Sequence, residues 1–207
     1  MLKMTNKKID PRVKRTNQYL INAIVKLLND KDINKISIQN ITDSADLTRA
    51  TFYLHYRDKQ DFFNRIVTNV IDDLIDYVKD GHLIASGLNN ESDIKNAFTR
   101  LFEYIYMNYE FFSVMLSDRG LSQFRPKLES VVQKEIYIPL FHALVKIDGE
   151  KTSKFPQHYF LNYITSAHIG VICTWLNDDM NYSPKYMAEL LYKLTLEGIF
   201  SVVRSEF

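Results

Sequence analysis

Between residues 48 and 56 the chain carries a dense set of side chains that donate hydrogen bonds. The set consists of one cation and four hydroxyl groups: Thr48, Arg49, Thr51, Tyr53 and Tyr56. A guanidinium group can bind a guanine edge or a phosphate, and hydroxyl groups can donate to phosphate oxygens. Lys59 follows in the first turn of the next predicted helix, where backbone amides already favour an anion. This pattern indicates a surface that binds a polyanion.

The charge of the chain is unevenly distributed. Residues 1–65 carry 13 Lys and Arg against 7 Asp and Glu, a net charge of +6, whereas the remainder has a net charge of −5. A basic end followed by an acidic remainder indicates that the first third meets a polyanion such as nucleic acid. The first ten residues are rich in lysine and lack the apolar core of a signal peptide, so we expect a cytoplasmic protein.

The sequence contains no motif typical of an enzyme. It has no glycine-rich phosphate loop, no G-x-S-x-G and no H-E-x-x-H. Its five histidines show no close metal-ligand spacing, and the single cysteine, Cys173, excludes an internal disulfide framework or a cysteine-based zinc site. We therefore expect no catalytic residue, no metal and no cofactor, with a small all-α enzyme as a remote alternative.

Apolar residues recur mostly at helical spacing, which predicts an all-α fold of about nine helices. The predicted helices, with approximate ends, cover residues 10–30, 37–44, 48–55, 58–79, 92–108, 111–116, 122–146, 155–177 and 183–205. Asp10, Ser37, Thr48 and Asp58 are the expected N-caps of the first four helices. Pro139 lies inside the seventh helix and should kink it.

Two of these helices are short and follow one another within the basic segment, as a helix-turn-helix requires. In the turn between them, Ala45 allows close packing, Asp46 tolerates a left-handed backbone, and Leu47 plugs the core. The second short helix would then enter the major groove of DNA, which is wide enough for one helix. Phe52 is expected in the core, whereas Leu54 is either a core residue or part of the exposed face.

Residues 36–63 resemble the DNA-binding signature of the TetR/AcrR family of transcriptional regulators. The most specific part of the match is Thr51-Phe52-Tyr53-x-His55-Tyr56-x-Asp58-Lys59. Residues 12–28 also resemble the first helix of that family. The C-terminal part, with Gly170-x-x-x-x-Trp175-Leu176 and Ser183-Pro184, is similar to the C-terminal region of a Firmicutes-type branch. The resemblance implies an N-terminal DNA-binding domain and a C-terminal helical domain that dimerises and binds an effector.

The resemblance also implies roles for individual residues. Ser37 is expected to touch phosphate, and Lys59 is expected to contact the DNA backbone. The third helix is expected to read the major groove through Thr48, Arg49, Thr51, Tyr53, His55 and Tyr56, and Gln39 and Ala50 complete the expected DNA-binding set. The chain departs from the family where Asp46 and Ala50 replace frequent glycines. The first change fits a left-handed turn, and the second can alter which base edges are within reach.

Residues 155–177 contain no charged side chain. This stretch could span a bilayer by length, but it includes too many polar groups for a helix that faces lipid. An uncharged helix is buried on most of its sides, either within one subunit or against a second copy. We expect the second copy, with an interface that includes Asn162, Ser166, Ile169, Gly170, Cys173, Met187, Leu190, Leu191 and Leu194. The TetR family dimerises through similar helices.

The C-terminal two-thirds of the chain contains many large aromatic and apolar side chains. They form either an ordinary core or an effector pocket, since ligand pockets are mostly apolar with a few polar groups. The candidate pocket residues are Phe98, Phe102, Tyr106, Phe111, Met115, Tyr137, Phe141, His142, Tyr159 and Tyr163. The ligand itself cannot be inferred from these residue types.

Together these observations predict a homodimeric transcriptional regulator, a repressor, that binds a palindromic double-stranded DNA operator. Residues 1–60 would form the DNA-binding domain and residues 61–207 the effector and dimerisation domain, with the helix at 58–79 shared. A small molecule bound to the C-terminal domain would shift the operator affinity. The alternative is a co-regulator or co-activator whose C-terminal domain docks a protein partner.

Overall fold

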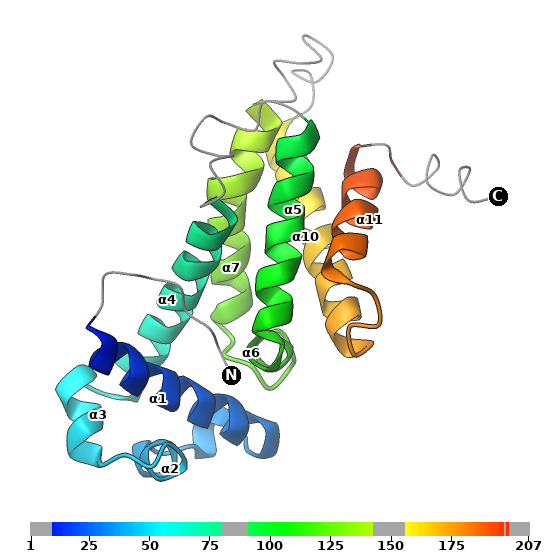
Figure 1. Ribbon diagram of the computed structural model, residues 1–207. Helices are drawn as coiled ribbons and strands as arrows, with labels where there is room; N and C mark the ends of the chain where they lie inside the picture. Colours follow the sequence, from blue (N-terminus) through cyan, green and yellow to red (C-terminus); the bar gives the residue numbers. More distant parts are fainter. Residues whose placement is uncertain (1–9, 80–90, 143–155, 197, 199–207) are drawn as a thin grey trace. The chain divides into compact units, whose positions relative to one another are not determined.

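The computed structural model describes residues 10–79, 91–142, 156–196 and 198, and no strand occurs in these ranges (Figure 1). Nine α-helices are described: α1 (Pro11–Asp30), α2 (Ile38–Ser44), α3 (Arg49–His55), α4 (Lys59–Lys79), α5 (Glu91–Met107), α6 (Tyr109–Met115), α7 (Phe124–Val132), α10 (Gln157–Asn177) and α11 (Pro184–Leu196). A 3₁₀ turn covers Ile33–Lys35. The all-α prediction is confirmed, and the predicted helix ends at Lys146 and Ser205 lie outside the described residues.

The first helices begin where their capping residues predict. Asp10 caps α1 by accepting a hydrogen bond from the amide of Arg12 over 2.8 Å, with Pro11 as the first helical residue. Ser37 and Asn40 form a reciprocal capping box at the start of α2, where the Ser37 hydroxyl accepts from the Asn40 amide and the Asn40 side chain accepts from the Ser37 amide. These local side-chain contacts fix where each short helix starts.

The seventh predicted helix is interrupted. α7 ends at Val132, and a π-helical turn follows at Gln133–Tyr137 before helical geometry returns at residues 138–142. Pro139 has no amide hydrogen to donate to the carbonyl of residue 135, and the π turn directly precedes it. A π turn thus directly precedes the proline at which the sequence predicts a kink.

The chain divides into two compact units, and the division falls inside α4. The first unit comprises residues 1–73 and 107–128, and the second comprises residues 74–106 and 129–207. α6 and the first half of α7 therefore belong with the N-terminal helices, whereas the domain boundary expected from the sequence lies at residue 60. In the first unit α1 packs on α2 and on α6.

The core of the first unit is formed by fully buried side chains from α1, α2, α3 and α4. They include Leu20, Ile24, Leu28, Ile41, Phe52 and Phe62. Phe52 lies at the centre of an aromatic cluster, with ring centroids 5.4 Å from Tyr56 and 5.3 Å from Phe62. These contacts anchor α3 to α4, so the position of the short helix depends on aromatic packing behind it.

In the second unit, aromatic rings from α5 and α10 pack edge to face. Phe102 and Trp175 have ring centroids 5.2 Å apart, and the Trp175 indole donates to the Tyr182 carbonyl over 2.9 Å. Within the described part of the chain, no helix has the length and apolarity needed to cross a membrane.

Candidate nucleic-acid interface

The turn between α2 and α3 is tight and is fixed by backbone hydrogen bonds. The Ala45 amide donates to the Ile41 carbonyl over 3.0 Å, and the Leu47 amide donates to the Thr42 carbonyl over 2.9 Å. Asp46 adopts φ of 54°, the left-handed conformation that the sequence predicted for it. Thr48 then caps α3, because its hydroxyl accepts from the Thr51 amide over 3.1 Å. The result is a helix-turn-helix whose second helix has a defined start.

α3 presents one side to solvent. Arg49, Ala50, Tyr53 and Leu54 are exposed, whereas Phe52 on the opposite side is fully buried. Positions 49, 50, 53 and 54 share a helix face because residues one turn apart lie above one another. Tyr53 is 47% exposed and Leu54 is 81% exposed. The sequence did not decide whether Leu54 belongs to the core or to the exposed face, and the structure places it on the surface.

Arg49 and Tyr53 form a pair on this exposed face. Arg49 Nη2 lies 3.4 Å from the Tyr53 hydroxyl, and the guanidinium carbon lies 5.9 Å from the ring centroid. An arginine that rests along a tyrosine loses less side-chain freedom when it binds a planar acceptor. The pair is therefore suited to present a guanidinium to a guanine edge or a phosphate.

Of the remaining predicted contacts near the helix starts, Ser37, Gln39 and Thr48 are exposed and Thr51 is half-buried. Ser37 and Thr48 use their hydroxyl groups as N-caps, and the Thr48 and Thr51 hydroxyl oxygens lie 2.9 Å apart. The Gln39 amide donates to the Asp43 carboxylate one turn later. A hydroxyl that caps a helix by accepting an amide hydrogen still has its own proton, and that proton can be donated to a phosphate. In Ser37 the proton is donated to Asn40 Oδ1 over 2.9 Å, so a phosphate oxygen would replace that acceptor.

Tyr56, by contrast, lies inside the first unit. It is 4% exposed, and its hydroxyl donates to Asn17 Oδ1 in α1 over 3.0 Å. Burial raises the pKa of Tyr56 to about 12. The expectation that this hydroxyl donates to phosphate does not fit this position, because the group is enclosed and already bonded. Its observed contact instead ties α1 to the residue that follows α3.

Lys59 and His55 are half-buried. Lys59 Nζ donates to the Ile36 carbonyl over 2.8 Å and lies 3.4 Å from the Ile33 carbonyl. The ammonium group therefore holds the segment before α2 against the start of α4. The His55 ring lies beside Tyr56, with centroids 6.4 Å apart. Of the two side chains, Lys59 is the one that links separate segments of the helix-turn-helix domain.

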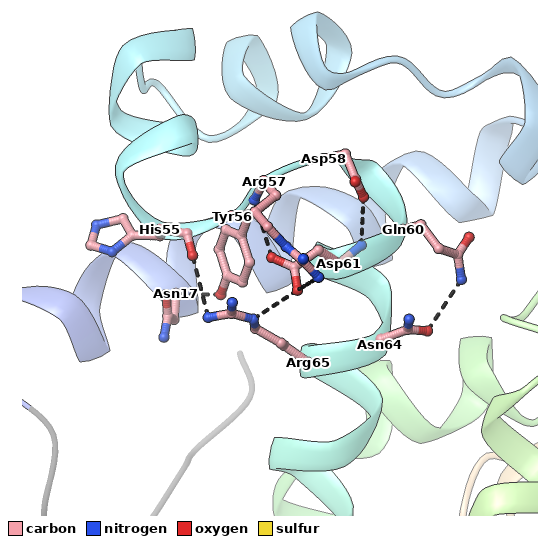
Figure 2. Close-up of polar contacts among 9 residues, drawn as sticks. All are labelled: Asn17, His55, Tyr56, Arg57, Asp58, Gln60, Asp61, Asn64 and Arg65. Atoms are coloured by element: carbon pink, nitrogen blue, oxygen red, sulfur yellow. Dashed lines mark hydrogen bonds and ion pairs between the residues drawn. The ribbon is translucent and has the colours of Figure 1, made fainter.

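A charged network joins the end of α3 to α4 (Figure 2). Asp61 Oδ1 accepts from Arg65 Nε over 3.0 Å, and Asp61 Oδ2 accepts from the Arg57 amide over 3.1 Å. Arg65 also reaches the His55 carbonyl over 3.4 Å with Nη1. The hydrogen bond from the Arg57 amide, together with the nearby Arg65, holds the pKa of Asp61 below its usual range.

Sequence reasoning did not assign this network a role. An acidic residue flanked by arginines four positions away on both sides is the signal that could have indicated it, because residues four apart face each other on a helix. The partnership between Tyr56 and Asn17 had no such local signal, since 39 residues separate the two.

The candidate pocket residues belong to both units. Phe111 and Met115 belong to the first unit, where Phe111 packs on Phe112 and Phe124. In the second unit, Phe98 and Tyr137 contact the ring of His168, Phe102 and Tyr106 contact Trp175, and Phe141 contacts Phe160. His142, Tyr159 and Tyr163 are exposed. Most of the set therefore consists of packing residues.

An apolar cavity of about 210 Å³ lies between α10 and α11 within the second unit. It is lined by Phe160, Tyr163, Ile164, Ala167, His168, Val171, Leu191, Leu194 and Thr195. Only Tyr163 of the predicted pocket residues lines this cavity.

His168 is the polar centre beside that cavity, and its hydrogen bonds define its tautomer. The Thr195 hydroxyl donates to the Leu191 carbonyl over 2.6 Å, so it must accept from His168 Nε2 at 2.9 Å. His168 Nδ1 then accepts from the Tyr137 hydroxyl at 2.6 Å. Burial lowers the pKa of His168 to about 4 and raises the pKa of Tyr137. The ring is therefore neutral at pH 7.

The predicted interface residues on α10 and α11 divide between surface and core. Asn162, Ser166 and Gly170 are exposed, and Cys173, Leu190 and Leu194 are half-buried. Ile169, Met187 and Leu191 are buried within the subunit, because they lie on the helix sides that face the rest of the second unit. The exposed side of α10 consists of His158, Tyr159, Asn162, Tyr163, Ser166, Ala167, Gly170, Thr174 and Asn177, and it includes no Asp, Glu, Lys or Arg.

Known proteins match both parts of this chain. Residues 92–197, about half of the chain, match the family TetR_C_8, described as a transcriptional regulator C-terminal region. Residues 20–66 match the family TetR_N, described as bacterial regulatory proteins of the tetR family. A curated relative, the uncharacterised HTH-type transcriptional regulator YxbF of Bacillus subtilis (strain 168), is 23% identical over 188 residues. That match covers 86% of this chain and 44% of the relative, so the chain spans less than half of the relative's length.

Solved structures with the same fold are also regulators. The fatty acid degradation regulator FadR from Bacillus halodurans aligns with a TM-score of 0.70 at 16% identity, covering 93% of this chain and 98% of that one. A TetR-family regulator from Syntrophomonas wolfei aligns with a TM-score of 0.65 at 16% identity, covering 88% and 94%. At these identities the structures show the fold alone. Because residues 92–197 and residues 20–66 match these two family models, and α2 and α3 form a helix-turn-helix, this chain belongs to the TetR family of bacterial transcriptional regulators.

Proposed function

We propose that this TetR-family regulator is a cytoplasmic homodimer that binds a palindromic operator through α2 and α3 and represses transcription. The observation that carries the proposal is the exposed side of α3, where Arg49 and Tyr53 are paired with each other and take no part in the core. An exposed guanidinium on a short helix behind a tight turn is the arrangement that reads the major groove.

The proposed contacts fall into two kinds. Arg49, Ala50 and Tyr53 face the groove and would contact base edges. Ser37, Gln39, Thr48 and Thr51 lie at the helix starts and would contact phosphates, which position a protein on DNA without reading its sequence. Lys59, His55 and Tyr56 would contribute indirectly, because their contacts within the protein hold the helix-turn-helix in shape.

Dimerisation is supported by the uncharged exposed face of α10. One helix of seven residues reads only a few base pairs, whereas two such helices about 34–36 Å apart read both halves of a palindrome. A Cβ atom added at Gly170 would meet nothing within 4 Å in the subunit, so the backbone there is open to close approach by a second copy. The half-buried Leu190 and Leu194 of α11 would extend the same interface.

Regulation is proposed to act through the second unit. α4 contributes residues to both units, so a change in the second unit that moves α4 would change the spacing of the two copies of α3. The cavity between α10 and α11 is apolar and would suit a small apolar effector. One of the similar structures is named as a regulator of fatty acid degradation, which is compatible with an apolar ligand.

A second candidate is an activator that docks a protein partner on the second unit. Tyr182 and Tyr186 are exposed and stacked, with ring centroids 4.8 Å apart, at the turn before α11 and its first residues. Exposed aromatic pairs favour protein interfaces. The similar structure of DhaS, with a TM-score of 0.52 at 16% identity over 90% of this chain and 97% of that one, is named as an operon activator.

Selection of duplexes from a random DNA pool tests the proposal. We expect the purified chain to enrich an inverted repeat with half-site centres about one helical turn apart. Affinity for the enriched duplex should fall steeply with salt, as phosphate contacts require. Enrichment of no sequence, or binding that ignores sequence at every salt concentration, would refute the proposal.

A further inference from the structure

The exposed side of α3 contains an apolar strip next to its polar pair. Leu54 is the most exposed large hydrophobic residue among those described, at 81%, and Ala50 lies one turn earlier on the same side. The parallel strip consists of Arg49 and Tyr53, again one turn apart. The exposed side of α3 therefore has an apolar strip and a hydrogen-bonding strip next to each other.

Leu54 is available to contact a partner because its side chain takes no part in the core. Phe52, on the opposite side of α3, already fills the aromatic core against Tyr56 and Phe62. α3 has seven residues and is about 10 Å long, so Ala50 and Leu54 both fit within a major groove about 12 Å wide. An aliphatic group in that position neither donates nor accepts a hydrogen bond.

We propose that Leu54, with Ala50 beside it, reads the C5-methyl group of a thymine in each half-site. That methyl is the apolar feature that normal bases present in the major groove. At a cytosine or a purine in the same place, Leu54 would cover a polar edge that loses water and gains no partner, which disfavours those bases. Leu54 is thus a specificity-determining residue, and the inference rests on the proposed function.

Removal of single methyl groups from DNA tests this inference directly. Once the operator has been selected, each thymine is replaced in turn by deoxyuridine, which removes the C5-methyl and keeps the base pairing. The wild-type chain should lose about fourfold in affinity at one thymine in each half-site, the amount expected for one buried methyl. Leu54→Ala should lose a similar amount on the unmodified operator.

The double change identifies the contact. With Leu54→Ala, deoxyuridine at that same position should cause no further loss, since the methyl would no longer have a partner. Lys127→Ala, which removes an exposed cation in α7, should leave the deoxyuridine penalty unchanged. Leu54→Asn provides a second variant, and a repeated selection with it should lose the preference for thymine at that position.

The results separate this inference from the proposed function. If the operator is bound specifically but no deoxyuridine position matters, or if the penalty is the same with and without Leu54, the inference is overturned while the proposed function stands. If no duplex is enriched at all, both fail. Thermal unfolding checks that Leu54→Ala is folded, and we expect an unchanged Tm because the side chain is exposed.

Discussion

Arg65 bonds to Asp61 through Nε over 3.0 Å, and both residues lie in α4 directly behind the end of α3 (Figure 2). Through this pair the His55 carbonyl, at the end of α3, and the Arg57 amide are held by side chains of α4. α3 is therefore fixed at both ends, by the Thr48 cap at its start and by the carboxylate of Asp61 and the guanidinium of Arg65 at its end. A fixed helix presents its exposed face in a single orientation.

Loss of the Asp61 carboxylate should weaken this attachment. Because the pKa of Asp61 is lowered in the folded chain, its stabilising effect is present above the unfolded pKa of 3.8 and is lost as the pH falls through the folded pKa. Asp61→Asn should lower the Tm at pH 7 and reduce the further loss seen below about pH 4. Thermal unfolding between pH 3 and 7 measures both effects. Asp72→Asn, an exposed acid on the same helix, is the control, and an equal effect of both variants would contradict the role of Asp61.

The cap of α3 should contribute measurably to stability. Thr48→Ala removes the acceptor of the Thr51 amide and should lower the free energy of unfolding by about 1 kcal/mol. Thr48→Ser keeps the acceptor and should restore most of that loss. Urea unfolding of the three proteins gives the values. Equal stability of Thr48→Ala and the wild type would show that the cap does not stabilise α3.

Substitutions on the two sides of α3 should differ strongly in their effect on stability. Phe52→Ala removes a fully buried ring and should lower the free energy of unfolding by about 3–5 kcal/mol. Ala50→Ser, on the exposed side, should change it by less than about 0.5 kcal/mol. Chemical denaturation measures both variants. A large loss for Ala50→Ser would place that side of α3 against another part of the protein.

The neutral histidine of the second unit should make stability depend on pH in a separate range. Burial lowers the pKa of His168 from 6.5 to about 4, so between these values the unfolded chain binds a proton that the folded chain does not. The stability contribution is full above about pH 6.5 and declines by about 3 kcal/mol as the pH falls to 4. His168→Phe should flatten urea-unfolding stability across this range, whereas His142→Asn, an exposed histidine, should not. A slope unchanged by His168→Phe would contradict the assignment.

The uncharged face of α10 should be sensitive to a bulky residue only if a second copy covers it. Gly170→Leu adds a side chain where the subunit leaves open space, so the subunit should fold and the dimer should dissociate at least tenfold more readily. Light scattering coupled to size-exclusion chromatography gives the oligomeric state over a range of concentrations. Asn96→Leu, an exposed position on α5, is the matched control. If the Gly170→Leu protein dimerises as tightly as the wild type, the dimer interface does not include this face of α10.

Features set by neighbours in the sequence could be predicted, and features set by distant partners could not. The caps at Ser37 and Thr48 and the left-handed turn at Asp46 depend on residues within three or four positions. The contact of Tyr56 with Asn17 depends on how α1 lies against the residue that follows α3, and the residue types alone do not reveal that arrangement. Leu54 stayed ambiguous because a helix of seven residues is too short for its apolar period to distinguish two sides.

The candidate pocket illustrates the same limit. Its aromatic residues recur at helical spacing, which indicates packing but does not say against which element. Phe111 packs on Phe124 in the first unit, whereas Phe98 packs on His168 in the second. The sequence therefore grouped side chains that share a chemistry, although they belong to two different units.

The affinity of Arg49→Ala for the selected operator tests the central claim most directly. Loss of one arginine contact to a guanine should weaken specific binding by about 1–3 kcal/mol, or roughly 5- to 150-fold, and relax the preference at one base pair in each half-site. Lys127→Ala removes an exposed cation outside the proposed interface and should leave that affinity within about twofold of the wild type. An Arg49→Ala protein that binds the operator as tightly as the wild type, with the same base preferences, would contradict the account.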